Sequence, residues 1–393
     1  MGHDDVKPWI WLKTAEAGPL LETVEELSGP TDPASIDRIR SAFPDAPVNE
    51  AIQLVLARRR AEGKFPGIAS GLFCDRQGVE QATSLRVADY KAARFGTAGV
   101  LDLCCGIGGD TMSLARRGPT VGVDHAPHRA WMCGVNAEVE TRVEDVTRTV
   151  IDHPLVHVDP ARREESQGRR SWRLSDLRPG LEEIGSILNQ CEGGAVKLGP
   201  GLPRDFELPG HASTLEFIAE DQKLVQAVAW VGTLAAADGM RRATVLGADM
   251  SIEGSPGSPP GGGEAVVGRH LWVPHPVLER AELIPAALAD VQALELARGL
   301  GILIAEEPPD NSWFAGYRIE EVLPPRLGKV SSWLKKHDAG RVVVRTRDGA
   351  IDADEWTKRL IGAGHDSFTV FGLRLGKRIV AIVTREVVPD HSS

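Results

Sequence analysis

The sequence predicts an α/β protein in which a mostly parallel β-sheet carries helices on both faces. Between Gly99 and Leu246, short apolar runs alternate with stretches whose apolar residues recur at helical spacing, a pattern typical of doubly wound folds. The first apolar run leads into a glycine-rich loop, VLDLCCGIGGD at residues 100–110. Glycines at such a point let the backbone bend tightly and lie against a ligand.

Size and composition limit the possible classes of protein. The chain has 393 residues, so we expect at least two domains. A net charge of −10 argues against a protein whose whole surface is positive and binds nucleic acid without specificity. Five cysteines without a CxxC pair or zinc-like spacing indicate reduced thiols and no metal site. Because neither a signal peptide nor a long apolar run is apparent, we expect a cytoplasmic protein without a membrane segment.

Residues 1–78 predict an N-terminal helical region. Apolar residues recur at helical spacing between Leu20 and Leu27, and Asp32-Pro33 is typical of a helix start. The basic run at residues 58–60 suits a helix C-terminus, where positive charge is favourable. A break follows at residues 64–67.

Residues 79–250 predict the doubly wound domain. Strands are expected near residues 100–104, 120–123, 140–143, 155–158, 195–198, 214–218 and 224–230. Helices are expected near residues 109–117, 127–136 and 180–190. One helical face is expected through residues 78–95, where it carries Ala82, Leu85, Ala88 and Ala92. Seven strands in this order suit the Rossmann-like methyltransferase variant of the fold.

The end of the chain predicts a second domain. Residues 251–264 are rich in Gly, Pro and Ser and indicate a linker or exposed loop. Residues 265–387 predict a small α+β domain. Its expected helices lie near residues 276–283, 285–298, 327–337 and 354–363, and its strands near residues 301–305, 317–322, 341–346, 367–373 and 378–384.

Three ligands compete for the glycine loop. A phosphate-binding P-loop needs a lysine after the glycines, and none follows here. A dinucleotide site needs GxGxxG, but Thr111 stands at the third position. S-adenosylmethionine fits better, because Asp102 lies inside the strand, ahead of Gly106 and Gly108. The carboxylate of Asp102 can face the cationic methionine end, and Cys104, between it and the glycines, is a further cofactor-binding candidate.

Two later acids support that cofactor. Asp124 ends the second strand, where its two oxygens can accept from both ribose hydroxyls. Glu144 and Asp145 follow the third strand, where a carboxylate can accept from the adenine amino group. Ligands of such sheets bind at the carboxyl ends of the strands. Each acid alone is typical of a solvated strand end, but together with Asp102 they favour S-adenosylmethionine.

The fourth strand predicts the acceptor side. It ends in Asp159, Pro160, Ala161 and Arg162, which we take as the catalytic candidates. Methyltransferases that act on base amino groups often carry [DN]PP and an aromatic residue here, with the rigid turn presenting hydrogen-bond acceptors to the target nitrogen. Ala161 and Arg162 depart from that pattern, so the acceptor atom stays open.

Basic residues beside this strand predict substrate binding. Arg163, Arg169, Arg170 and Arg173 surround Trp172, a combination suited to phosphates and a stacked base. Lys197 ends the fifth strand. A solvated, salt-bridged loop and a surface lysine are the structural alternatives.

At these motifs the chain resembles bacterial class I methyltransferases with a C-terminal THUMP-like domain, relatives of trimethylguanosine synthases. The resemblance is carried by residues 80–84, Tyr90-Lys91-Ala92, the glycine loop, Asp124, Asn136-Ala137 and residues 159–163, and at the C-terminus by residues 270–274, Arg280-Ala281, Gly364 and Gly376-Lys377. It implies that Asp102, Gly106, Gly108, Asp124 and Asp145 hold the cofactor, that Gln81 closes over it, and that residues 159–162 face the acceptor.

The resemblance also implies an RNA substrate, because THUMP-type modules are RNA binders, with a guanine amino group as one possible acceptor. Trimethylguanosine synthases have Pro-Pro-Trp-Gly where this chain has Pro160-Ala161-Arg162-Arg163. In the C-terminal module, basic residues outnumber acidic ones 13 to 6 between Pro324 and Arg385, as on a surface that faces phosphates.

Three functions are therefore open. The first is an RNA methyltransferase whose C-terminal domain and arginine-rich loop grip the substrate. The second is a small-molecule or protein methyltransferase that uses the C-terminal domain to oligomerise. The third is an RNA-binding scaffold without catalytic activity.

Overall fold

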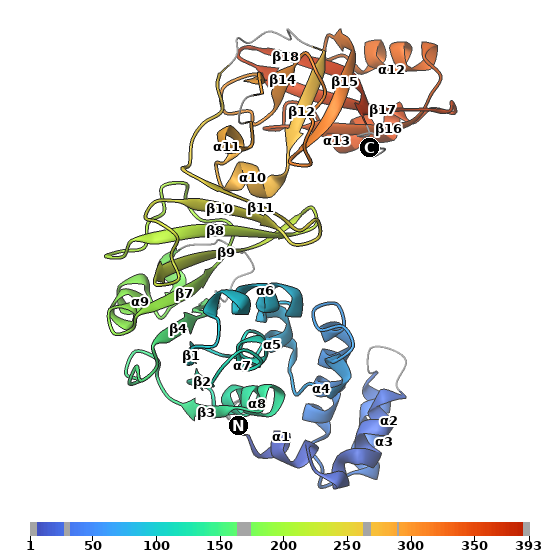
Figure 1. The fold of residues 1–393 in the computed structure, drawn as a ribbon. Helices are drawn as coiled ribbons and strands as arrows, with labels where there is room; N and C mark the ends of the chain where they lie inside the picture. Colours follow the sequence, from blue (N-terminus) through green and yellow to red (C-terminus); the bar gives the residue numbers. More distant parts are fainter. Residues whose placement is uncertain (1–5, 27–31, 163–173, 262–268, 289–290, 388–393) are drawn as a thin grey trace. The chain divides into compact units, whose positions relative to one another are not determined.

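The computed structural model describes residues 6–26, 32–162, 174–261, 269–288 and 291–387 (Figure 1). The chain divides into two units. The first unit comprises Met1–Glu220 and Val225–Met240, and the second comprises Asp221–Leu224 and Arg241–Ser393.

The N-terminal helices belong to the first unit. They are α1 (Lys7–Leu12), α2 (Gly18–Glu25), α3 (Pro33–Ala42) and α4 (Val48–Ala61). Asp32 begins α3 as expected, because its side chain accepts a hydrogen bond from the backbone of Ser35 at 3.0 Å. Leu54 and Phe65 share one apolar cluster with Ile107 and Met132. The helical region therefore packs against the glycine loop that contains Ile107.

One predicted helical face is interrupted. We expected helical spacing to continue through residues 78–95, but α5 (Arg76–Gln81) ends before α6 (Leu85–Phe95) begins. Ser84 starts α6, accepting from the backbone of Val87 at 3.5 Å. Ala82 is consequently in the turn between the helices. Apolar spacing alone did not reveal this break, because it continues across the turn.

The sheet of the first unit has the order β8-β9-β7-β4-β1-β2-β3. These strands are β1 (Val100–Leu103), β2 (Thr120–Asp124), β3 (Glu140–Val143), β4 (Leu155–Val158), β7 (Gly193–Leu198), β8 (Ser213–Glu220) and β9 (Lys223–Gly232). β3, β2, β1, β4 and β7 are parallel, whereas β9 runs antiparallel to β7. All seven predicted strands are present. The carboxyl ends of the parallel strands therefore form one edge, where the expected site residues lie.

Shorter elements complete the first unit. They are α7 (Thr111–Ala115), α8 (Pro127–Ala137), α9 (Leu181–Leu188) and a small ladder of β5 (Ala161–Arg162) with β6 (Leu177–Arg178). This ladder was not predicted. It pairs the backbone of Ala161 and Arg162, directly after Pro160, with residues 177–178, which follow the predicted arginine-rich loop at residues 163–173.

The second unit contains an antiparallel hairpin and a sheet. The hairpin joins β10 (Arg241–Val245) to β11 (Met250–Gly254). The predicted linker at 251–264 is thus wrong at its start, because residues 251–254 pair with β10. We missed this strand because the Gly- and Pro-rich sequence that follows dominated the prediction.

The sheet of the second unit has the order β13-β14-β12-β15-β18-β17-β16. Its strands are β12 (His270–Pro274), β13 (Leu294–Glu295), β14 (Leu303–Ala305), β15 (Phe314–Leu323), β16 (Ala339–Thr346), β17 (Asp366–Leu375) and β18 (Arg378–Val387), and its helices are α10 (Pro276–Arg280), α11 (Ile284–Leu288), α12 (Leu327–Lys336) and α13 (Ala353–Leu360). The helix expected at 285–298 is much shorter than predicted, since α11 ends at Leu288 and Leu294 begins a strand. α12 and α13 pack their apolar residues, including Val330 and Trp356, onto the sheet.

Across the described ranges, no helix combines the length and apolar character needed to cross a membrane.

Candidate active site

The glycine loop leaves β1 through backbone conformations with positive φ. Cys104, Gly106 and Gly108 have φ values of 60°, 56° and 87°. A Cβ atom at Gly106 would meet nothing within 4 Å, whereas one at Gly108 would lie 3.2 Å from Cα of Cys133. Gly108 therefore allows close packing onto α8. Gly106 leaves its backbone facing open space that a ligand can occupy.

Cys104 is not set up as a nucleophile. Burial, and then the neighbouring carboxylate of Asp124, raises the pKa of its thiol well above the usual range. A neutral thiol is a poor nucleophile. The predicted role of Cys104 as a cofactor-binding residue stays a prediction.

Asp124 holds the glycine loop in place. Its Oδ2 accepts a hydrogen bond from the backbone of Gly106 at 3.0 Å, and its Oδ1 accepts one from Ala126 at 2.9 Å. Each carboxylate oxygen can accept a second hydrogen bond. The predicted contact of Asp124 with ribose hydroxyls is thus chemically compatible with its contacts in the fold.

Asp145 is exposed after β3, at the same edge of the sheet. Hydrogen bonds from the backbone and then the hydroxyl of Thr147 lower the pKa of its carboxyl. Both bonds reach Oδ1, at 3.0 and 2.8 Å. Asp145 is therefore an oriented anion, and its predicted contact with the adenine amino group stays a prediction.

Asp102 is a buried carboxylate. We expected its carboxylate to face the methionine end of the cofactor, but the side chain is only 1% exposed. Its Oδ1 lies 2.7 Å from Nδ1 of His157, and its Oδ2 accepts a hydrogen bond from the hydroxyl of Thr111 at 2.5 Å. Protein groups thus engage both oxygens of Asp102, and its predicted contact with the methionine end of the cofactor stays a prediction.

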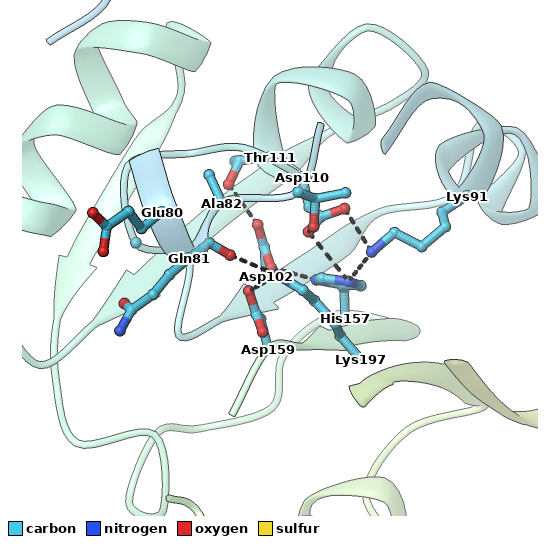
Figure 2. Close-up of polar contacts among 12 residues, drawn as sticks. Glu80, Gln81, Ala82, Lys91, Asp102, Asp110, Thr111, His157, Asp159 and Lys197 are labelled. Carbon is cyan, nitrogen blue, oxygen red and sulfur yellow. Dashed lines mark hydrogen bonds and ion pairs between the residues drawn. The ribbon is translucent and has the colours of Figure 1, made fainter. Parts of the chain in front are cut away.

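A buried polar network continues from Asp102 beneath the loop (Figure 2). On the far side of the His157 ring, Nε2 lies 3.2 Å from Nζ of Lys91. Lys91 also pairs with Asp110 at 2.7 Å, and Asp110 accepts a hydrogen bond from Thr83 at 2.6 Å. An ammonium group can only donate, so Nε2 accepts and Nδ1 carries the proton donated to Asp102. The network therefore links the turn before α6 to β1, β4 and the loop.

Charge balance explains how these groups stay buried. Burial alone would raise the pKa of Asp110, but the neighbouring ammonium group of Lys91 holds it below its ordinary value. Burial lowers the pKa of Lys91, an effect that Asp110 opposes. A buried charge without such a partner would be very costly.

Sequence reasoning missed this network. Lys91, Asp110, Thr111 and His157 were not site candidates. A signal was present in His157, a polar residue within the fully buried strand β4. Buried polar groups need partners, so this residue could have prompted a search for them.

Asp159 contacts a second predicted site residue. Nζ of Lys197 lies 2.6 Å from Oδ2 of Asp159 and donates to the backbone oxygen of Gln81 at 3.1 Å (Figure 2). Burial would lower the pKa of Lys197, but Asp159 and then Asp110 raise it. The structure thus brings together Gln81, Asp159 and Lys197, which were predicted separately as cofactor, catalytic and substrate residues.

The remaining candidates are only partly described. Pro160 is buried and Ala161 is exposed, and Arg162 is described through its backbone in β5 alone. Arg163, Arg169, Arg170 and Arg173 lie outside the described residues. Within the described residues, no group of three or more His, Cys, Asp and Glu side chains could hold a metal ion.

This fold is that of class I methyltransferases, joined to an α+β unit. A crystal structure of a candidate methyltransferase from Porphyromonas gingivalis superposes with a TM-score of 0.72, covering 94% of this chain and 98% of that one at 17% identity. The predicted fold class is therefore confirmed.

Sequence comparison adds relatives and a domain family. Two Mycobacterium tuberculosis proteins, each named an uncharacterized S-adenosylmethionine-dependent methyltransferase, are 29% identical over 353 residues, which is 86% of this chain and 95% of theirs. Residues 315–386 match the family "THUMP domain-like". The resemblance to methyltransferases with a C-terminal THUMP-like domain is confirmed, whereas the relation to trimethylguanosine synthases stays a prediction.

Proposed function

We propose that this protein is an S-adenosylmethionine-dependent methyltransferase that acts on RNA in the cytoplasm, with a base nitrogen as acceptor. The observation that carries the proposal is the loop after β1, where Gly106 faces open space and Asp124 fixes the loop at the carboxyl edge of the sheet. The relatives' names support the cofactor and the reaction.

The residues at this edge fit the cofactor. Gly106 offers backbone against which it can lie, Gly108 shapes the loop, and Asp124 and Asp145 retain acceptor capacity for hydroxyl and amino groups. The side chain of Gln81 is exposed, and its backbone oxygen accepts from Lys197, the partner of Asp159. Bound S-adenosylmethionine would supply a methyl group on a cationic sulfur.

Asp159 and Pro160 are proposed to receive the acceptor. Pro160 restricts the backbone after Asp159, and Lys197 holds one carboxylate oxygen of Asp159 at 2.6 Å. The other oxygen can accept a hydrogen bond from a base amino group. When donor and acceptor are held in position in this way, the positioning can supply much of the rate acceleration of methyl transfer.

RNA is favoured as substrate by the second unit. Its match to THUMP-like domains and the basic excess between Pro324 and Arg385 both support contact with phosphates. We accordingly propose that residues 79–250 carry catalysis, that residues 265–387 bind RNA, and that the arginines at 163, 169, 170 and 173 contribute further phosphate contacts.

One experiment tests this function. The protein is incubated with methyl-labelled S-adenosylmethionine and fractionated cellular RNA, and labelled nucleosides are identified by mass spectrometry. A methylated base in one RNA class is the expected result, absent with Asp159→Asn. Labelling of small molecules or proteins but not RNA would contradict the substrate class and favour the alternative methyltransferase.

A further inference from the structure

The segment of residues 79–82, at the C-terminal end of α5, is held through its backbone by two lysines. Three of its carbonyl oxygens, those of Val79, Glu80 and Ala82, accept hydrogen bonds from Nζ of Lys64 at 2.8, 2.8 and 2.7 Å. The remaining carbonyl, that of Gln81, accepts from Lys197. Four consecutive carbonyls at the end of a helix are thus bound by ammonium groups.

Such carbonyls need partners, because the last turn of a helix leaves its C=O groups without intrahelical donors. A cation is also favoured at this end by the helix dipole. Lys64 supplies all three of its N–H bonds to one short segment. It comes from the turn after α4, in the N-terminal helical region, and it has no predicted role in the site.

The segment held by Lys64 contacts the glycine loop directly. A Cβ atom at Gly109 would lie 3.1 Å from Cβ of Ala82 and 3.3 Å from the backbone of Thr83. The hydroxyl of Thr83 donates to Asp110, which follows the same loop. The position of this segment therefore affects both the loop and Gln81, whose side chain is exposed.

We propose that Lys64 is a positioning residue for the cofactor site. Its ammonium group fixes the backbone of residues 79–82 against the glycine loop, so that the N-terminal helical region forms part of the binding machinery without touching the ligand. This inference rests on the proposed function, since it assumes that S-adenosylmethionine or its product binds at the loop.

The test compares binding of S-adenosylhomocysteine by calorimetry to the wild-type chain, Lys64→Met and Lys64→Arg. Methionine keeps much of the apolar stem but loses the donors. We expect Lys64→Met to raise the Kd about tenfold, as when only about a tenth of molecules hold a competent site. Lys64→Arg keeps N–H donors but replaces the compact ammonium with a larger planar group, so its Kd should lie between those of wild type and Lys64→Met. Lys13→Met, at an exposed lysine of the same unit, is the matched control and should bind as wild type.

Chemical rescue separates positioning from folding. In Lys64→Ala, added methylammonium should restore affinity, whereas tetramethylammonium, which has no N–H donor, should not. A wild-type Kd in folded Lys64→Met, or no rescue of folded Lys64→Ala, would overturn the inference.

Two further results complete the design. If the variants do not fold, hydrogen exchange of backbone amides 82–85 in the wild-type protein decides. Exchange as fast as that of exposed loops would refute a fixed segment. Slow exchange that becomes slower with S-adenosylhomocysteine would support it. Absence of ligand binding by the wild-type chain would instead refute the proposed cofactor.

Discussion

Lys91 and His157 lie 3.2 Å apart beneath the glycine loop, one on helix α6 and the other in the central strand β4. Both side chains are buried, and the ammonium group of Lys91 is neutralised by Asp110 at 2.7 Å. The contact joins helix α6 to the strand that leads into Asp159. It lies at the centre of the buried network beneath the glycine loop.

Loss of the Lys91 charge should destabilise the fold. Lys91→Met leaves Asp110 as a buried anion without its cation, a change that costs about 3–5 kcal/mol of unfolding free energy. Urea denaturation measures the loss. The double variant Lys91→Met with Asp110→Asn removes both charges and should recover part of it. Equal stability of Lys91→Met and wild type would show that the ion pair contributes nothing.

Stability should fall in acid because of Asp110. Burial would raise the pKa of this carboxyl, but the ammonium group of Lys91 lowers it below its ordinary value. A lowered folded-state pKa adds stability above the unfolded value, about 3.9, and that stability is lost as pH falls through the folded-state pKa. Urea midpoints between about pH 2 and 7 should therefore drop less steeply in Asp110→Asn. Parallel curves for the two proteins would contradict this assignment.

The two loop glycines should respond differently to alanine. Gly108→Ala introduces a Cβ atom 3.2 Å from Cys133 at a φ of 87°, and should lower stability by at least about 1 kcal/mol. Gly106→Ala meets no protein atom within 4 Å, although its φ of 56° still adds strain. For each unit of stability lost, Gly106→Ala should weaken binding of S-adenosylhomocysteine more than Gly108→Ala does. Thermal unfolding and calorimetry measure both effects, and unchanged affinity in Gly106→Ala would argue against a ligand there.

Asp159 should matter for transfer more than for cofactor binding. We expect Asp159→Asn to lower methylation of RNA by about 100-fold or more, because an amide cannot replace a carboxylate paired with Lys197. Its Kd for S-adenosylhomocysteine should stay within about threefold of wild type. Asp152→Asn is the control, since Asp152 precedes β4 at the opposite end of the strand. Wild-type transfer by Asp159→Asn would exclude Asp159 from the acceptor site.

Much of the architecture could be predicted from the sequence because burial leaves a local signal. The strands at 140–143 and 155–158 have the predicted bounds, and the glycine loop follows β1 as expected. The break before Ser84 could not be predicted, because apolar spacing continues across it. Strand β11 could not be predicted either, because a Gly- and Pro-rich stretch follows it directly.

The network was harder to predict because its members are far apart in the chain. Lys91 and His157 are separated by 66 residues and Thr83 and Asp110 by 27, so no short motif contains both partners. Asp102 shows the same limit. Its place in the strand was predicted, but its engagement by His157 and Thr111 depends on long-range packing.

The apolar cluster shared by Leu54, Phe65, Ile107 and Met132 has a consequence for dissecting the chain. A fragment that begins at the predicted boundary, residue 79, would lose the helices that cover Ile107 and Met132, and it would also lose Lys64. Its newly exposed apolar surface would favour aggregation. Catalytic fragments should therefore retain the N-terminal helices, because these helices cover the apolar residues of the glycine loop and of α8.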